Sequence, residues 1–425
     1  DKTPLNTNRG FFHYYGFRSA PADATASQLG QFIQTALRGQ DRVALKNAAA
    51  ASTFKVNRHV LVYSYCQQQY GQPPNPRHVD IRRIRAISGG VITLDSPLVF
   101  DHRDDYPHVR NYIHCPGMAR ILMIDRDDVP LGVLHRIEGL RTLQSPYARG
   151  AAGSWEKTVQ SWLQATGVLR TELVDCDLQG IACGEGRQVT IQRSKIAYAE
   201  PDKCLEKLRV ESGEIRSLQS CAGVGSVTFT GTTFTGMAMC LAIRQKFTRC
   251  HFRGPLGGDG SGGLSVNGQQ PIVDVQVDDC TFYGRNAKLN PAIQDIQPYP
   301  RVTIGSGVTL LSGSVLKVPM SMTYGSPYQK LIDGARVGGI ISIDSVRGGF
   351  ARVTRIWGDS SHGYIQLQPS TSLGNGMVLR MRLLEKLTVR NAVLSNCVRI
   401  NIDALQSAWN GTTLTSPPAS LVATV

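Results

Sequence analysis

The sequence lacks the features that mark several common classes of protein. No run of eighteen or more apolar residues occurs, so no helix is expected to span a membrane. No Cys-x-x-Cys pair is present, which disfavours zinc ribbons and thioredoxin-like redox sites. Only 18% of the residues are charged, and neither end forms an acidic or basic tail. This composition is that of a folded chain and argues against extensive disorder.

Glycine and positive charge are what the chain has in abundance. Its 425 residues include 43 glycines and few aromatics, a composition that favours many turns and short strands over long helices. The formal net charge is +14, which favours a polyanionic partner such as an anionic glycan, a nucleic acid or a membrane surface. The alternative is that the surplus charge only keeps a large assembly soluble.

Ten cysteines are spread through the chain. We expect most of them to be reduced, small core residues, because their positions follow the repeat described next. Reduced cysteines fit assembly in a reducing cytoplasm better than secretion. The ten are Cys66, Cys115, Cys176, Cys183, Cys204, Cys221, Cys240, Cys250, Cys280 and Cys397.

A short pattern recurs along the middle of the chain: an apolar residue, a small residue three positions later, and a second apolar residue five positions after the first. The copies begin at positions 173, 191, 210, 229, 247 and 277, so successive starts differ by 18, 19, 19, 18 and 30. A fixed period of about 19 residues indicates a solenoid, and the period of two within each copy predicts two strands joined by a bend. The copies are Leu173-Cys176-Leu178, Ile191-Ser194-Ile196, Val210-Gly213-Ile215, Phe229-Thr232-Phe234, Phe247-Cys250-Phe252 and Val277-Cys280-Phe282, with Val389-Ala392-Leu394 as a later copy.

This repeat predicts an all-β fold built on a right-handed parallel β-helix. Coils stacked about 4.8 Å apart pair their backbone amides with the next coil. Like residues then lie above one another, Phe229 near Phe247 and Cys250 near Cys280. The one long gap contains the glycine-rich segment 254–263, which we interpret as a loop inserted into one coil.

The segments on either side of the repeat predict other elements. Residues 22–51 have an apolar stripe of helical spacing from Leu29 to Leu37, and Asp41 is placed to cap a second stretch, so we expect an N-terminal helix that covers the open end of the solenoid. Residues 84–94 and 353–367 each predict a β-hairpin, and each follows a further apolar strand. We interpret them as two related antiparallel β-modules that flank the solenoid.

These elements predict five parts. They are a capping or attachment segment at 1–55, a small β-module at 56–130, the parallel β-helix at 131–300, a second β-module or insertion at 301–385, and a final coil with a C-terminal tail at 386–425.

Two motifs resemble a known family. The sequences Phe229-Thr-Gly-Thr-Thr-Phe234 and Val277-Asp-Asp-Cys-Thr-Phe282 are similar to coils of pectin-lyase-like β-helix proteins, and the hairpin from Ile84 to Leu98 resembles small modules attached to bacteriophage tailspike β-helices. The resemblance implies a homotrimeric virion appendage, assembled in the host cytoplasm, that binds or cuts the surface polysaccharide of a bacterium. It also implies contacts with other tail or capsid proteins.

Hydrolysis of a glycan needs two carboxylates across the scissile bond, and these would come from outward positions of the coils. The candidates are Glu211 with Glu214, where proximity would raise one pKa as a general acid requires, and Asp278 with Asp279, which follow the glycine-rich segment. The alternative is a ladder of neutralised surface charge. The outward column Asp177, Lys195, Glu214, Thr233, His251, Thr281 and the column Glu172, Thr190, Arg209, Thr228, Lys246, Gln276 both mix signs, as such a ladder would.

A basic side of the coils is the candidate substrate-binding surface, because arginine forks suit carboxylates and phosphates. Its members are Arg193, Lys195, Arg209, Arg216, Arg249 and Arg253. We expect no cofactor, no metal site and no specific nucleic-acid partner, since no metal-ligand spacing or phosphate-binding loop occurs.

The sequence therefore leaves three candidate functions. The first is a phage tailspike or tail fibre that binds host polysaccharide, with or without cleaving it. The second is a purely structural β-helical adaptor or head appendage of a virion. The third is a secreted polysaccharide lyase or hydrolase.

Overall fold

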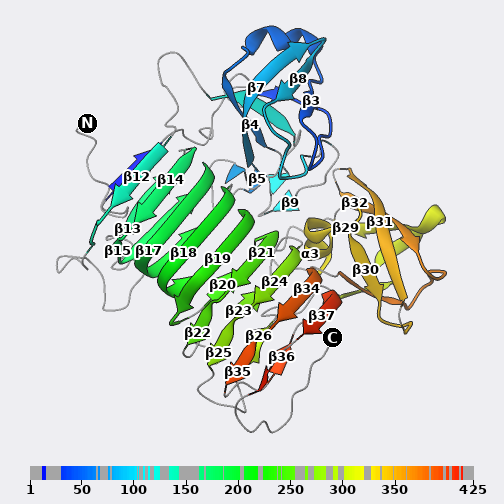
Figure 1. The fold of residues 1–425 in the computed structure, drawn as a ribbon. Coiled ribbons are helices and arrows are strands. Elements are labelled where there is room, and N and C mark those ends of the chain that lie inside the picture. Colours follow the sequence, from blue (N-terminus) through cyan, green and yellow to red (C-terminus); the bar gives the residue numbers. More distant parts are fainter. Residues whose placement is uncertain are drawn as a thin grey trace.

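In the computed structural model, the described residues fold mostly as strands, with little helix (Figure 1). The described residues are 12–15, 30–63, 66–67, 75–76, 79–102, 104, 109–110, 113–114, 119–124, 134–142, 162–166, 169–184, 186–201, 205–218, 224–236, 238–240, 242–253, 264–266, 272–283, 291–294, 301–319, 327–335, 337–347, 349–359, 361–381, 384–395, 399–401, 404–410 and 413–414. The glycine-rich segment 254–263 lies outside them.

A sheet of 21 strands dominates the molecule and runs diagonally across Figure 1. Its longest ladder joins nine strands by parallel pairing, each to the next in chain order. These are β12 (Leu134–Glu138), β14 (Arg170–Val174), β17 (Gly186–Pro201), β18 (Leu205–Leu218), β19 (Val224–Phe234), β21 (Arg244–Thr248), β24 (Ile272–Asp278), β34 (Leu384–Arg390) and β37 (Ala404–Asn410).

Two more parallel ladders run beside the first, and most of the described turns of the chain contribute to all three. The second ladder follows a bend in the chain and contains β15 (Asp177–Leu178), β22 (His251–Arg253), β25 (Thr281–Tyr283), β35 (Val393–Ser395) and β38 (Thr413–Leu414), with the later parts of β17, β18 and β19. The third contains β1 (Phe12–Tyr15), β13 (Trp162–Thr166), β16 (Gly180–Gly184), β20 (Ala238–Cys240), β23 (Leu264–Val266), β26 (Pro291–Gln294) and β36 (Arg399–Asn401), with the ends of β17 and β18.

The register of the first ladder is the one that the repeat predicts. The first apolar residues of successive copies pair with one another in an unbroken row. The row is Leu173, Ile191, Val210, Phe229, Phe247, Val277 and Val389. The later copy at Val389 therefore stacks directly on Val277, although the whole segment 278–388 lies between them in the sequence.

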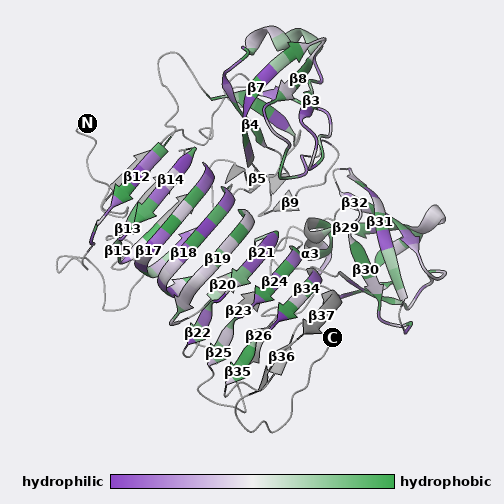
Figure 2. Cartoon of the chain, in the orientation of Figure 1, coloured by the Kyte–Doolittle hydropathy of each residue, from purple (hydrophilic) through white to green (hydrophobic). Residues whose placement is uncertain are grey.

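The inward side chains form the main core, and the alternation of apolar and polar residues along the strands is visible in Figure 2. Phe229 and Phe247 stack with centroids 5.2 Å apart and ring planes 5° apart, as the repeat predicts. Cys250 also lies on Cys280, whose Sγ accepts from the Cys250 amide at 3.4 Å. Among the described residues, the cysteines that are free and buried are Cys176, Cys240, Cys250 and Cys280.

A six-stranded antiparallel sheet, the first sheet, precedes the parallel sheet in the chain and lies at the top of Figure 1. Its order is β2 (Gln31–Phe32), β11 (Arg120–Met123), β4 (His59–Tyr63), β7 (Val79–Ser88), β8 (Val91–Leu94) and β3 (Arg42–Ala44). Two short pairs, β5 (Cys66–Gln67) with β6 (Asn75–Pro76) and β9 (Val109–Arg110) with β10 (Ile113–His114), complete this region.

The predicted N-terminal helix is wrong for the described residues 30–51. Ile33 bridges Leu45, Ala36 bridges His102, and Gly30 has a φ of +81° that ends any helix there. Only a short 3-10 helix, η1 (Ala48–Thr53), is present in this stretch, and Asn47 caps it in place of Asp41. Ile33 and Ala36 of the apolar stripe pack into the core of the first sheet, whereas Phe32 is exposed, so tertiary pairing overrides helical spacing.

In the sequence, the strands of a closed barrel lie between β26 and β34. In barrel order its strands are β27 (Arg301–Ile304), β28 (Gly307–Leu311), β29 (Val315–Pro319), β32 (His362–Pro369), β31 (Gly349–Gly358), β30 (Ile340–Ile343) and β33 (Val378–Met381). The 3-10 helix η2 (Ser312–Ser314) and helix α3 (Pro327–Gly334) belong to the same segment. The whole barrel is therefore inserted between two coils that stack on each other.

Six of the seven barrel strands repeat the order of the first sheet, and β28 is the additional strand. β2, β11, β4, β7, β8 and β3 correspond in order to β27, β33, β30, β31, β32 and β29. Both hairpins have the predicted strands and the same one-residue bulge, at Ile84/Ala86 in β7 and at Val353/Arg355 in β31. The matching topology and bulge support the two related modules that the sequence predicts.

Candidate functional site

The outward columns predicted from the repeat are present on the parallel sheet. Asp177, Lys195 and Glu214 pair in register on successive coils, and the column continues through Thr233, His251 and Thr281. The second column, from Glu172 to Gln276, is also in register. Charged side chains are therefore held at the spacing of the coils on a rigid surface.

A third column of residues lies at the bend between the two strands of each coil. The repeat predicts this bend at the small inward residue, but the structure has it one residue earlier. The residue before the inward residue of each bend has a left-handed φ of 48° to 68°, which lets the chain turn. These residues are Gly139, Asp175, Arg193, Ser212, Gly231, Arg249, Asp279 and Asn391. Some of their side chains pair along the column: Arg193 donates twice to Asp175, at 2.8 Å each, and Asn391 donates to Asp279 at 3.0 Å.

Glu211 and Glu214 lie on either side of the bend in β18. Glu211 accepts from Gln192 at 2.9 Å and pairs with Arg209. The hydrogen bond from Gln192, with the charge of Arg209, lowers the pKa of Glu211. A general acid needs a raised pKa, so Glu211 is not the member of the pair that would supply it. Glu214 accepts from the Thr235 hydroxyl at 3.2 Å.

Asp278 and Asp279 lie at the end of β24 and directly after it. Asp278 Oδ1 is buried without a hydrogen bond among the described residues, and the Arg390 Nε of the next coil lies 3.7 Å from it. Asp279 is exposed in the left-handed column and accepts from Asn391. Each carboxylate therefore already faces a neighbour on the following coil.

The six predicted basic residues are all exposed on the coils. Arg193 and Arg209 form ion pairs with Asp175 and Glu211. The guanidinium of Arg253 lies 5.7 Å from the ring centroid of Tyr283. For Lys195, Arg216 and Arg249 we find no carboxylate partner within the described part of the chain. These three, together with Arg253, are the side chains of the set that a ligand can reach without breaking an ion pair.

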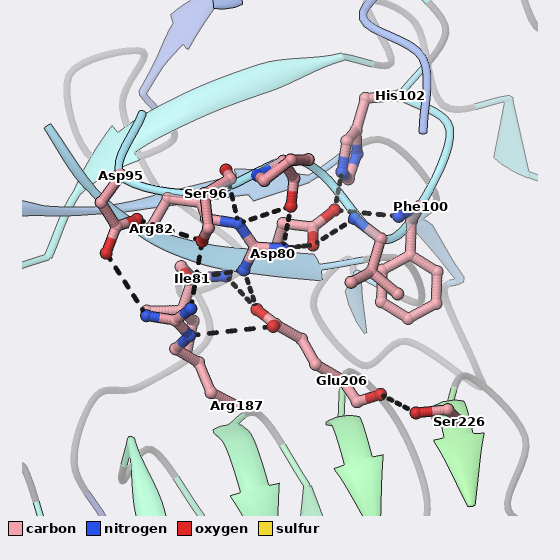
Figure 3. Close-up of polar contacts among 12 residues, drawn as sticks. Asp80, Ile81, Arg82, Asp95, Ser96, Phe100, His102, Arg187, Glu206 and Ser226 are labelled. Atoms are coloured by element: carbon pink, nitrogen blue, oxygen red, sulfur yellow. Dashed lines mark hydrogen bonds and ion pairs between the residues drawn. The ribbon is translucent and has the colours of Figure 1, made fainter. Parts of the chain in front are cut away.

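A buried charged network that the sequence did not predict joins the first sheet to the parallel sheet (Figure 3). Arg82, 1% exposed, donates to Asp80 at 2.7 Å and pairs with Glu206 at the start of β18. His102 Nε2 lies 2.7 Å from Asp80, and Arg187 Nε lies 3.7 Å from Glu206. Arg82 also donates to the carbonyls of Ile81, Ser96 and Pro97, and Asp80 accepts from the amides of Val99 and Phe100.

The same network is where the two sheets pack. Leu61 and Ile81 of the first sheet form a small apolar cluster beside the charges with Leu169, the residue directly before β14. A Cβ on Gly225 would lie 2.5 Å from the Val99 side chain, so only glycine lets the two sheets approach this closely. The charged groups of this network already have partners inside the protein. The network therefore holds the first sheet against the parallel sheet and is not expected to bind a substrate.

Stability is expected to depend on pH through Glu206. Desolvation, with the charge of Asp80 added, raises the pKa of Glu206 from 4.5 to about 7 against the opposing charges of Arg82 and Arg187. The folded state then binds a proton more tightly than the unfolded state, so the free energy of unfolding falls as pH rises from about 4.5 to about 7, by at most about 1.4 kcal/mol per pH unit. Urea denaturation at several pH values measures this slope.

Glu206→Gln provides the comparison, because an amide does not titrate. We expect the variant to lose this downward slope. Equal slopes in the two proteins would contradict the assignment to Glu206.

Among the described residues no group of three or more His, Cys, Asp and Glu side chains could hold a metal ion. The described helices include none that is long and apolar enough to cross a membrane.

Comparison with known proteins finds similarity only to solved structures. No family model and no curated protein matches the sequence. The tailspike gp49 of Pseudomonas phage LKA1 is 10% identical, with 83% of this chain and 81% of that chain covered and a TM-score of 0.31. The phi297 tailspike gp61, also of a Pseudomonas phage, is 10% identical over 83% and 80% of the two chains, with a TM-score of 0.24. The Gp54 tailspike of Acinetobacter baumannii bacteriophage AP22, solved with a capsular saccharide, is 7% identical over 82% of each chain, with a TM-score of 0.25.

Proposed function

We propose that this chain is a tailspike or tail fibre of a bacteriophage that binds host surface polysaccharide along the outside of its coils. The observation that carries the proposal is the set of in-register outward columns, which hold charged side chains on successive coils of one rigid sheet. A polysaccharide is a linear repeating ligand, so a surface with a linear repeat can contact several of its sugars at once. The net charge of +14 favours an anionic chain.

The finer architecture belongs to the same proposal. We infer that the three parallel ladders wind as a right-handed β-helix of the pectin-lyase-like kind, since crossovers between parallel strands are right-handed in almost all proteins. We further infer that three copies associate side by side, that the trimer attaches to other virion proteins, and that it assembles in the host cytoplasm. The free, buried cysteines agree with assembly under reducing conditions. The predicted parts at 131–300, 301–385 and 386–425 are retained as domains in this proposal. The boundary between 1–55 and 56–130 is wrong, because β2 and β3 belong to the same sheet as β4, β7, β8 and β11.

Binding is expected to weaken when accessible cations of the coils are removed. Arg216→Ala and Arg249→Ala should each reduce affinity for an anionic capsule about tenfold, the effect of losing one charge-assisted hydrogen bond. The measurement is equilibrium binding to capsule or lipopolysaccharide from a panel of candidate hosts.

Arg136→Ala is the matched control. Arg136 is also exposed, and its replacement removes the same charge, but it lies on the first described coil and pairs with Glu138 at 3.3 Å. An unchanged affinity in the Arg216 and Arg249 variants, or an equal loss in the control, would argue against binding at these positions.

Cleavage is a separate part of the proposal. New reducing ends in the same incubations would indicate hydrolysis, and unsaturated sugars would indicate a lyase. The residues proposed to act are Glu211, Glu214, Asp278 and Asp279, so product release should disappear when each is replaced by its amide.

A structural adaptor is the second candidate function. The ion pairs that already occupy Glu211 and Arg193 favour it, because a neutralised ladder serves packing against other virion chains as well as it serves a ligand. Silence across a broad polysaccharide panel, together with assembly onto tails, would support this candidate. A secreted lyase or hydrolase is the third, and it requires product release without association with a particle.

A further inference from the structure

The β31–β32 hairpin of the barrel carries an ordered aromatic stack. Trp357 and Tyr364 are directly opposite on the two strands, with ring centroids 5.4 Å apart and planes 9° apart. The guanidinium of Arg355 lies 4.7 Å from the centroid of the Trp357 ring. The His362 ring lies 6.4 Å from Tyr364. The two aromatic side chains are half-buried and are not part of the barrel core.

Asp359 at the hairpin turn holds this stack in position. Its carboxylate accepts from the amides of Ser361 and His362, each at 2.8 Å, and from the Tyr364 hydroxyl at 2.7 Å. The Ser361 hydroxyl donates to the same carboxylate at 3.0 Å. These hydrogen bonds, the one from the Ser361 amide first, hold the pKa of Asp359 well below its usual range. The stack is therefore rigid before any ligand arrives, which reduces the entropy that binding must overcome.

The first sheet is an internal control for what the fold requires. Trp357 and Tyr364 are opposite each other where the first sheet pairs Ser88 with Val91. That hairpin closes through two residues, Gly89 and Gly90, and has the same bulge as β31. Since the same topology forms with a serine and a valine at these positions, packing does not explain the aromatic pair.

We propose that Arg355, Trp357 and Tyr364 form a binding site for an acidic saccharide. The C–H face of a pyranose ring packs well on aromatic surface, and tyrosine and tryptophan combine such a surface with a polar group. Arg355 has no carboxylate partner within the described residues, so its guanidinium is available to a sugar carboxylate. At the other end of the stack, Asp359 Oδ2 accepts only from the Tyr364 hydroxyl among the described residues, so this oxygen can also accept a sugar hydroxyl.

The opposite charges at the two ends select the class of ligand. A single-stranded nucleic acid would also use aromatic rings and an arginine, but it carries a phosphate at every nucleotide and would meet the fixed negative charge of Asp359. An acidic polysaccharide offers a carboxylate to Arg355 and neutral hydroxyls to Asp359. This inference rests on the proposed function and deepens it, since it names a class of glycan and a second place where the chain holds it.

The test uses the full chain and three probes: a polyuronate (polygalacturonate), neutral dextran and single-stranded oligothymidylate. Trp357→Ser combined with Tyr364→Val gives the barrel the residues of the first sheet. We expect this double variant to bind polyuronate at least about tenfold more weakly than the wild type, with an unchanged urea midpoint. Arg355→Gln should remove most of the preference for polyuronate over dextran while keeping the aromatic contact.

Failure of this inference is separable from failure of the proposed function. If the double variant binds polyuronate as the wild type does, the barrel site is overturned and binding on the coils stands. If the double variant loses oligothymidylate binding and keeps polyuronate binding, the ligand class is overturned in favour of nucleic acid. If the wild type binds neither polyuronate nor any polysaccharide of the host panel, the proposed function itself is overturned. If the urea midpoint of the double variant falls, Trp357→Phe is the control variant. It keeps an aromatic ring at position 357 and should retain binding.

Discussion

Replacing Arg82 with alanine is expected to lower the free energy of unfolding by about 3–5 kcal/mol. The substitution leaves Asp80 and Glu206 buried without their shared cation, and it leaves the carbonyls of Ser96 and Pro97 without their donor. Removing one member of a buried ion pair costs far more than the pair itself contributes, because the remaining charge cannot be solvated. Urea denaturation at neutral pH measures the loss.

Arg83→Ala is the matched control. Arg83 is the next residue of β7 but is exposed, and its amide, rather than its side chain, accounts for its hydrogen bond to Asp95. The control should change stability by no more than about 0.5 kcal/mol. Limited proteolysis adds a local measurement, since loss of Arg82 should detach the first sheet from β18 before the coils unfold. A loss below about 1 kcal/mol would show that water or rearranged side chains replace Arg82.

The stacking of the coils could be predicted from the sequence because it depends on one-dimensional periodicity. Phe229 and Phe247 begin successive copies of the repeat and meet in space, since each coil repeats the backbone of the previous one. The contact of Val277 with Val389 was predictable for the same reason, even across an inserted barrel. The bend was located only approximately, because a left-handed φ at Arg193 or Arg249 leaves no trace in residue type.

The N-terminal segment could not be predicted in the same way. The positions of Phe32, Ile33 and Ala36 satisfy a helical period. However, Phe32 pairs with Arg120 and Ala36 bridges His102, and both partners lie far away in the sequence. Local spacing cannot report such partners. The glycines at positions 30 and 39 were the available signal against a helix. Both have a positive φ, but the sequence alone does not tell which glycines need that conformation.

The polar sites were the least predictable features. The alternation in Val79-Asp80-Ile81-Arg82 correctly indicates a strand, yet it suggests that Asp80 and Arg82 face water. They are buried because residues 96–102 and Glu206 of the parallel sheet cover them, and Glu206 comes from 124 residues further along the chain than Arg82. Trp357 and Tyr364 stand out only when the two hairpins are aligned, because the comparison with Ser88 and Val91 separates what the fold needs from what it does not.

Replacing Phe247 with alanine is expected to cost about 3–5 kcal/mol of stability, the usual range for a phenylalanine removed from a packed core. Phe247 is fully buried and stacks on Phe229, with Phe252 5.7 Å away between ring centroids. The cavity cannot close easily, because hydrogen bonds fix the spacing of the coils above and below it. Phe247→Leu should cost less, since it restores much of the volume, and Lys246→Ala, on the outward side of the same strand, should change stability by at most about 0.5 kcal/mol. Urea denaturation of the three variants tests the order, and a Phe247→Ala protein as stable as the Lys246 control would mean that the ring contributes little to the stacking of the coils.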